Sequence, residues 1–229
     1  MKGALGALAL GVLALGAFVL WPSAPGPADP AHRMPAATLP ANGPLRIVTL
    51  GTSLTLGGDW RERLAADLSA CAARPVEVVP VAEAGEDSDW GAAQMDRVIA
   101  LQPSLVLIEF AINDADMLDG VTLGTARKNH EAILGALKQA VPVLVTMSPA
   151  FGPRGWIRPN LPDYEAQYRA MADERKIGLI DIAPVWRKAL EGNRRHLMPD
   201  GLHPTDAAMV EVALPVIRAE LGRVIQNCG

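Results

Sequence analysis

Two short segments near opposite ends of the chain carry side chains that could act together in acyl transfer. The segment 51–55 places Ser53 directly after a continuous apolar run, where the chain turns toward a helix. The segment 200–204 places Asp200 three residues before His203. A carboxylate at this spacing can accept the Nδ1–H of His203 and leave Nε2 free to take a proton from a serine hydroxyl. These residues therefore predict a nucleophile, a general base and an orienting acid.

Two further residues could donate hydrogen bonds to a developing oxyanion. Gly85 offers a backbone N–H that a ligand can approach closely, because glycine has no side chain. Asn113 offers a carboxamide NH2. Taken singly, Ser53, Gly85 and Asn113 are ambiguous, because such residues often only cap helices or form turns. Their occurrence together, each after a predicted strand, favours a catalytic site.

His130 and His196 lack a carboxylate at the spacing of Asp200 and His203. His130 falls in the middle of a predicted helix, where we expect it to be exposed. His196 follows two arginines in a segment that has the character of a solvated loop. His203 is therefore the predicted base.

The elements that must position these residues alternate along the chain. Short Val/Ile/Leu-rich runs predict five strands, over 45–50, 76–81, 105–110, 141–147 and 178–181. Helical spacing of apolar residues predicts helices over 60–73, 91–101, 122–140, 163–176 and 205–226, the last kinked at Pro215. This alternation predicts an α/β fold, a doubly wound, flavodoxin-like five-stranded parallel sheet in a three-layer α/β/α arrangement. Ligands of such sheets bind at the carboxyl ends of the strands, where the candidate residues occur.

The four segments, in this order, resemble the conserved blocks of the SGNH hydrolase (GDSL-like lipase/esterase) family, named for its Ser, Gly, Asn and His. The resemblance covers most of the chain. It implies a serine esterase in which Ser53 is the nucleophile, His203 the base and Asp200 its orienting acid. It also implies an oxyanion hole formed by the Ser53 and Gly85 backbone amides and the Asn113 side chain, and a reaction without a metal or organic cofactor.

Two positions depart from the family pattern. Thr52 stands where the family usually has an aspartate before the serine, so any role of that acid in anchoring the loop must be filled otherwise. Ala111 replaces the glycine of the Gly-x-Asn-Asp block. If the backbone at Ala111 required a positive φ, the strain would be on the order of 1 kcal/mol and could displace Asn113.

The substrate is less defined by the sequence than the reaction. Aromatic and basic residues lie near the expected site, namely Trp90 and, within 148–162, Phe151, Arg154, Trp156 and Arg158. The aromatic residues could stack on a sugar, although local packing is the more common role. The family resemblance leaves open a carbohydrate deacetylase and an esterase of small esters or lipids, so the substrate is a small-molecule, polysaccharide or lipid ester.

Other functions for the same fold remain as alternatives. One is a non-catalytic SGNH-like binding domain or an O-acyltransferase-like protein that acts on envelope polysaccharide. Another is a flavodoxin-like or receiver module. A receiver needs carboxylates at the end of the first strand, whereas this strand leads into Leu50-Gly51-Thr52-Ser53, which disfavours that alternative.

The N-terminus differs in composition from the rest of the chain. Lys2 precedes an uncharged apolar run over 3–20, which predicts that residues 1–21 are a signal peptide or an N-terminal membrane anchor. The Pro/Ala-rich segment 22–44 is expected to be a poorly ordered linker to a hydrolase domain over 45–229. We therefore expect export to the periplasm or the cell exterior, with a possible membrane tether through residues 3–20.

Composition limits the partners and the covalent structure. The formal net charge is −4, with 21 basic residues scattered among 25 acidic ones, which disfavours binding to nucleic acid. The two cysteines, Cys71 and Cys228, form either a disulfide or two free thiols, and their expected places at the ends of the first and last long helices are compatible with a bridge. No CxxC motif is present, which disfavours structural zinc. The oligomeric state stays open.

Overall fold

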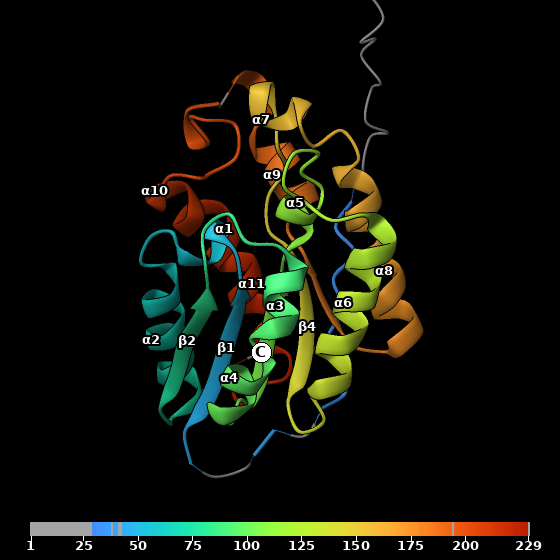
Figure 1. Cartoon of the computed structure of the whole chain (residues 1–229). Coiled ribbons are helices and arrows are strands. Elements are labelled where there is room, and N and C mark those ends of the chain that lie inside the picture. Colours follow the sequence, from blue (N-terminus) through green and yellow to red (C-terminus); the bar gives the residue numbers. More distant parts are fainter. Residues whose placement is uncertain (1–28, 38, 41–42, 194, 229) are drawn as a thin grey trace, which may run out of the picture.

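The computed structural model of the chain describes residues 29–37, 39–40, 43–193 and 195–228 (Figure 1). The signal peptide or anchor predicted over 1–21 lies outside the described residues. Among the described residues, no helix combines the length and apolar character that a membrane crossing requires.

A five-stranded, all-parallel sheet forms the centre of the domain, in the order β2-β1-β3-β4-β5. The strands are β1 (Leu45–Gly51), β2 (Val76–Ala82), β3 (Leu105–Glu109), β4 (Val141–Thr146) and β5 (Gly178–Asp181). The predicted sheet is confirmed, and each predicted strand agrees with the observed one within one residue at either end. The strand order reverses between β1 and β3, which is where this class of sheet binds its ligands.

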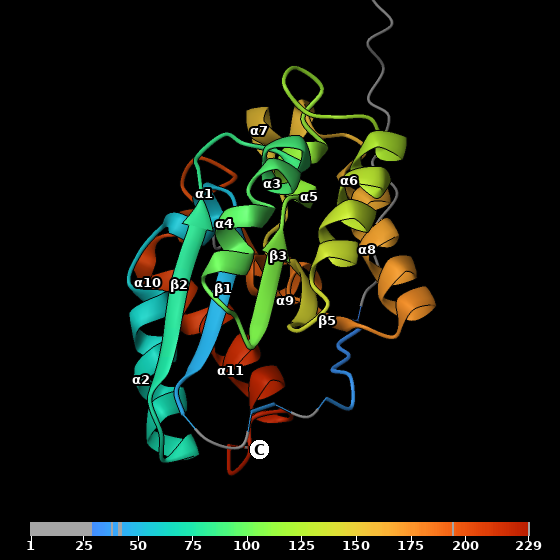
Figure 2. The ribbon, with the colours of Figure 1, turned by 60° about the horizontal axis from the view of Figure 1, so that its bottom comes forward.

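Helices cover both faces of the sheet (Figures 1 and 2). On one face, α2 (Trp60–Ala72) packs against α11 (Leu214–Gly222). The other face carries α3 (Ser88–Ala93), α4 (Met95–Ala100), α6 (Leu123–Ala136) and α8 (Leu161–Arg175). With both faces covered, all five residues of β3 are buried, which explains why the strands appear in the sequence as uninterrupted apolar runs.

Several shorter helices lie beyond the carboxyl ends of the strands. They are α1 (Ser53–Leu56), α5 (Ala111–Asp114), α7 (Gly152–Trp156), α9 (Ala183–Ala189) and α10 (Asp206–Ala208), together with 3-10 turns over Glu191–Asn193 and Arg195–Leu197. Apart from α10, which falls within the helix predicted over 205–226, the sequence analysis did not predict these elements as helices. Two of them, α1 and α5, carry candidate site residues.

The closing helix predicted over 205–226 is interrupted, as the proline within it suggested. A π-helical turn, Met209–Ala213, separates α10 from α11. Pro215 lies in the first turn of α11, where a residue without an N–H costs no intrahelical hydrogen bond. The predicted helix over 91–101 is also two helices, which meet at Gln94.

Residues 29–37, which we call the N-terminal strap, lie against the edge strand β5. Arg33 and Leu179 pair in antiparallel fashion, with N···O distances of 2.8 and 2.7 Å. The Ala31 N–H donates to Asp181 Oδ2 at 3.1 Å, and the Asp181 N–H donates to His32 Nδ1 at 3.0 Å. Within the predicted linker 22–44, the strap thus pairs with backbone groups that an edge strand leaves free.

A disulfide joins Cys71, near the end of α2, to Cys228, which follows α11. The two Cα atoms are 5.0 Å apart, within the usual range for such a bond. Because α2 and α11 share one face of the sheet, the fold brings together two residues separated by 157 positions.

Candidate active site

The structure brings Ser53, His203 and Asp200 into one hydrogen-bonded line at the carboxyl end of the sheet. Ser53 Oγ lies 2.9 Å from His203 Nε2. His203 Nδ1 lies 2.6 Å from Asp200 Oδ2. This geometry lets the imidazole accept the serine proton on one nitrogen while the carboxylate holds the proton on the other.

The loop that carries His203 is built around the Asp200 carboxylate. Asp200 Oδ1 accepts the backbone N–H groups of Leu202 at 2.9 Å and His203 at 2.8 Å. Partial burial raises the pKa of Asp200, but the hydrogen bonds from His203 and Leu202 outweigh it and lower that pKa to about 2. The acid therefore stays ionised at neutral pH and can stabilise an imidazolium.

Gly201 gives this loop its shape. Its φ is +80°, a left-handed conformation that L-residues with side chains rarely adopt. An added Cβ would also collide with the carbonyl oxygen of Phe151, and the Phe151 N–H donates to the Gly201 carbonyl at 2.9 Å. The loop of His203 is thereby attached to the segment that leads into α7.

The two predicted oxyanion donors lie on neighbouring segments, Gly85 on the loop after β2 and Asn113 on the short helix α5. The Asn113 side chain is buried and donates one N–H to the Glu86 carbonyl at 2.9 Å, which uses one of its two amide hydrogens. Gly85 has a φ of +87°, and no described atom lies within 4 Å of a Cβ placed there. The loop of Gly85 follows β2, beside the Ser53 turn, since the Glu83 N–H donates to the Gly51 carbonyl at 3.2 Å.

Ala111 does not require the backbone conformation that would favour glycine. It is the first residue of α5 and is absent from the described residues with positive φ. The strain considered for this position therefore does not arise, and Asn113 is held within a regular turn of helix.

Thr52 contacts a buried acid that the sequence analysis did not single out. Its Oγ1 lies 2.8 Å from Glu109 Oε2, and its N–H donates to the same oxygen at 3.3 Å. Burial raises the pKa of Glu109 to about 8, against a smaller opposing effect of the Thr52 and Thr55 hydrogen bonds. One sequence feature could have identified Glu109, because it is the one charged residue in the apolar run 105–110.

His130 corrects our expectation of an exposed side chain, because it is fully buried between α6 and α8. Its Nδ1 lies 2.7 Å from the Ala126 carbonyl, which can only accept, so Nδ1 carries the proton. The neutral ring then accepts at Nε2 from the Tyr168 hydroxyl at 2.7 Å. Tyr168 in turn accepts the Phe110 N–H at 3.0 Å. Burial lowers the pKa of His130 to about 4, so the ring is neutral and supports the turn before Asn113.

Asp114 is a second buried acid close to the site. Its Oδ1 accepts the Ser88 N–H at 2.8 Å and so joins α5 to the start of α3. Its Oδ2 has no hydrogen-bond partner among the described residues and lies 4.0 Å from His130 Nδ1. Burial raises the pKa of Asp114 to about 7.

Most of the aromatic and basic residues near the site are engaged in packing. Arg158 is buried, pairs with Asp116 at 2.7 Å and donates to the Ile112 carbonyl at 2.7 Å. Trp90 packs against the ring of Phe110, and Arg195 covers the ring of Phe151. In contrast, two residues of α7 are exposed, namely Arg154 and Trp156, the latter to 73%.

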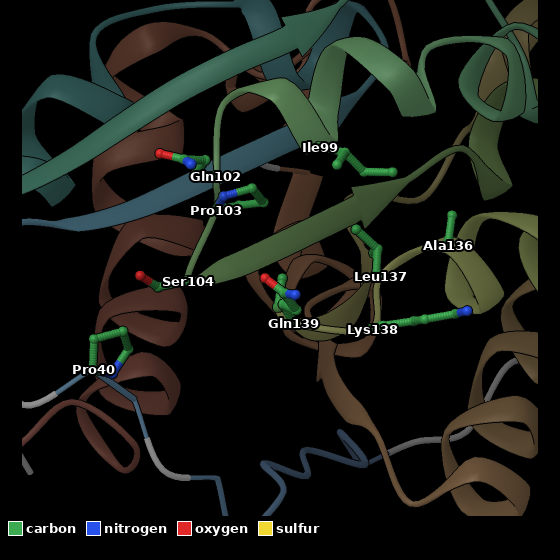
Figure 3. Close-up of a pocket in the computed structure, with 10 residues that line it drawn as sticks. Pro40, Ile99, Gln102, Pro103, Ser104, Ala136, Leu137, Lys138 and Gln139 are labelled. Carbon is green, nitrogen blue, oxygen red and sulfur yellow. The ribbon is translucent and has the colours of Figure 1, made fainter.

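A cavity of about 520 Å³ lies at the opposite end of the sheet (Figure 3). Its lining includes Ser104 and Ala140, which directly precede β3 and β4, and Pro40. Among the described residues of this lining, Lys138 is the one that is charged, and none carries a carboxylate or an imidazole. Among the residues that the structure describes, no group of three or more His, Cys, Asp or Glu is arranged to hold a metal ion.

The α/β/α fold with a serine at the strand-order reversal is compatible with an acylhydrolase, and a family comparison identifies that class of protein. The model of the GDSL-like lipase/acylhydrolase family matches residues 48–209. The chain belongs to this family, so the sequence resemblance is confirmed. A comparison with curated proteins finds none that matches.

Solved structures share the fold at low sequence identity. A lipase/acylhydrolase from Enterococcus faecalis is 23% identical, with a TM-score of 0.66, and the match covers 78% of this chain and 96% of that one. A catalytic mutant of Axe2, an acetylxylan esterase from Geobacillus stearothermophilus, is 18% identical, with a TM-score of 0.69 and coverage of 79% and 96%. A GDSL-like lipase from Bacteroides thetaiotaomicron is 20% identical, with a TM-score of 0.61 and coverage of 78% and 88%.

Proposed function

We propose that this acylhydrolase is a serine esterase that cleaves carboxylic esters through a Ser53-His203-Asp200 triad. The observation that carries the proposal is the pair of short contacts at His203, 2.9 Å to Ser53 Oγ and 2.6 Å to Asp200 Oδ2. Membership of the GDSL-like family supports the same reaction class.

In the proposed reaction, Ser53 Oγ attacks the ester carbonyl carbon while His203 Nε2 takes the hydroxyl proton. The tetrahedral intermediate carries its negative charge on the former carbonyl oxygen. When the intermediate collapses, His203 donates the proton to the leaving alcohol and the acyl group remains on Ser53. Water then attacks the acyl-enzyme, with His203 again as base, and releases the acid.

The proposed oxyanion hole consists of the backbone amides of Ser53 and Gly85 and the second N–H of Asn113. The bond from Asn113 to the Glu86 carbonyl supports this assignment, because it fixes the amide plane and links the Asn113 side chain to the loop of Gly85. Such donors are effective because they are oriented before the charge develops.

Hydrolysis of p-nitrophenyl acetate by purified variants tests the proposal. Ser53→Ala is expected to lower turnover by about 10⁴-fold or more, and Asn113→Ala by about 10²- to 10³-fold. A fluorophosphonate is expected to label Ser53 in the wild type. Near-native hydrolysis by Ser53→Ala would contradict the triad, and hydrolysis replaced by acyl transfer to a glycan acceptor would favour the transferase alternative.

We further propose acetyl or other short acyl esters of carbohydrate as the first substrates to test. The support is the exposed Trp156 on α7, since an indole face can stack on a sugar ring. The residue before this helix, Phe151, is hydrogen-bonded to Gly201 in the loop of His203. One of the structural neighbours is an acetylxylan esterase. Trp156→Ala is expected to raise KM for acetylated xylooligosaccharides and leave KM for p-nitrophenyl acetate unchanged. Equal effects on both substrates would argue against a sugar contact.

Export is proposed from sequence alone. The apolar run over 3–20 supports either a cleaved signal peptide or a retained membrane anchor. The disulfide is compatible with an oxidising compartment. Mass analysis of the mature protein tests the two forms, because a mature N-terminus after residue 21 would exclude the anchor.

A further inference from the structure

We propose that Glu109 is the positioning residue of the nucleophile turn, in place of the acid that the family usually carries directly before its serine. Here that position is Thr52, and the acid comes from the neighbouring strand β3. The inference rests on the proposed function and extends it by one residue that acts through Thr52 and Thr55, without itself contacting the substrate.

The sheet register places Glu109 beside the nucleophile turn. Glu109 is the last residue of β3 and pairs with Gly51, the last residue of β1. A Cβ at Gly51 would collide with Thr55 Oγ1 and lie 2.9 Å from the Glu109 carbonyl oxygen and 3.1 Å from Glu109 Oε2. Because glycine at position 51 has no side chain, the Glu109 carboxyl group can contact Thr55 Oγ1 in this space.

Three donors of the turn converge on one carboxyl oxygen. Glu109 Oε2 lies 3.3 Å from the Thr52 nitrogen, 2.8 Å from Thr52 Oγ1 and 3.3 Å from Thr55 Oγ1. Both threonines are buried. The acid thus holds α1 by the residue before Ser53 and by the residue two positions after it.

The held turn orients both functional groups of Ser53. Thr52 is the N-cap of α1, and its Oγ1 accepts the Leu54 N–H at 3.2 Å. Rotation of Thr52 would turn the peptide that carries the Ser53 N–H and would shift Oγ relative to His203. A displacement of about 1 Å at a reacting atom can cost about 10²-fold in rate.

The surroundings of Glu109 favour its neutral form at physiological pH. Burial raises the pKa of the carboxyl to about 8, and the nearby Asp114 adds to this effect. Tyr168 on α8 is uncharged, since its pKa is raised well above the usual value. Arg61 on α2 donates to the Thr55 carbonyl on the other side of the turn. A neutral acid anchors the turn without placing a negative charge behind the oxyanion hole.

The test uses variants of the full chain that remove either the acceptor or a donor. Glu109→Leu removes the acceptor and Thr52→Val removes one hydroxyl at nearly constant volume. Glu109→Gln keeps a neutral acceptor. Thr49→Val is the matched control, because Thr49 is buried in β1 and its hydroxyl has no hydrogen-bond partner among the described residues. Near-ultraviolet circular dichroism establishes the folded fraction to which rates are referred.

We expect Glu109→Leu and Thr52→Val each to lower kcat by about tenfold to a hundredfold, with KM within about threefold of the wild type. Fluorophosphonate labelling of Ser53 should slow by a similar factor. Glu109→Gln should recover most of the kcat that Glu109→Leu loses. The loss of kcat in the double variant Thr52→Val/Glu109→Leu should be smaller than the product of the two single losses, because both changes break the contact between Thr52 Oγ1 and Glu109 Oε2.

Equal kcat in Glu109→Leu, Glu109→Gln and Thr49→Val would overturn the proposal, as would multiplicative losses in the double variant. A change confined to KM would also overturn it. The proposed function fails on a different result, namely hydrolysis by Ser53→Ala at the wild-type rate, so the two failures are distinguishable.

Discussion

Three titratable side chains near the candidate active site are held in their neutral forms by burial. Burial raises the pKa values of Glu109 and Asp114 to about 8 and about 7, and it lowers that of His130 to about 4. At pH 6 none of the three is expected to carry a full charge. The ionised carboxylate of the site is instead Asp200, which lies near the surface and accepts hydrogen bonds from its own loop.

The stability of the protein should depend on pH through Glu109. Its carboxyl has a pKa of about 8 in the folded state and a reference value of 4.5. Between these values the unfolded chain releases the proton while the folded state keeps it, so the wild-type free energy of unfolding falls as pH rises. The Glu109→Gln side chain cannot titrate. Between pH 4.5 and 9, the free energy of unfolding of this variant should therefore rise by up to about 5 kcal/mol relative to that of the wild type. Urea unfolding at both pH values measures this gain, and a pH-independent difference would contradict it.

The Tyr168 hydroxyl should contribute to stability through two buried hydrogen bonds. Tyr168→Phe removes the donor to His130 Nε2 and the acceptor of the Phe110 N–H. Because both partners are then left buried without a hydrogen bond, the free energy of unfolding should fall by about 2 to 4 kcal/mol. Urea unfolding checks this, with Tyr164→Phe for comparison, since that hydroxyl makes a single bond, to the Val121 carbonyl. An equal loss in both variants would count against the network.

At the scale of elements, the strands could be predicted more reliably than the short helices. The strands are buried on both faces and therefore appear as continuous apolar runs. In contrast, α1 and α5 are four residues long, too short for a helical period to show in the sequence. The prediction that His130 is exposed was wrong, because the apolar pattern of α6 does not reveal that Tyr168 on α8 covers this position.

In the candidate site, too, contacts within one segment could be predicted from the sequence, whereas contacts between strands could not. Asp200 and His203 lie on one loop, so their spacing in the sequence was enough to predict their contact. The contact between Thr52 and Glu109 depends on the pairing of β1 with β3, which brings together residues 57 positions apart. An acid in an apolar run was visible, but its partner could not be read from local sequence.

The loop of His203 should be sensitive to any side chain at Gly201. Gly201→Ala adds a Cβ at a φ of +80° and into the Phe151 carbonyl, so the loop must move. We expect kcat for p-nitrophenyl acetate to fall by about 10²-fold, since His203 moves with the loop. Gly192→Ala is the control, because its φ is +70° but no described atom lies within 4 Å of the added Cβ. Similar losses in both variants would show backbone strain alone to be responsible.

At the scale of the whole molecule, the disulfide closes a loop that holds every candidate site residue except Ser53. Reduction, or a Cys71→Ser/Cys228→Ser variant, should lower the free energy of unfolding by about 5 kcal/mol, because a loop closed over 157 residues restricts the unfolded chain. Urea unfolding with and without dithiothreitol measures the effect, and the serine variant should not respond to the reductant. Unchanged stability of the wild type after verified reduction would refute this expectation.

The direction of the N-terminal strap bears on where the enzyme can work. Ala31 contacts Asp181 at the carboxyl end of β5, so the chain joins the domain at the same end of the sheet as Ser53. In the anchored form that we propose as one possibility, the eight residues 21–28 reach at most about 28 Å. With the protein in vesicles, brominated lipids should then quench the fluorescence of Trp156, which is the part of the quenched emission that the Trp156→Phe variant lacks. If the wild type and Trp156→Phe lose the same emission, this orientation is excluded. Such a short connection would turn the end of the sheet that carries Ser53 toward the lipid headgroups. Hydrolysis would then be confined to esters within a few nanometres of the bilayer.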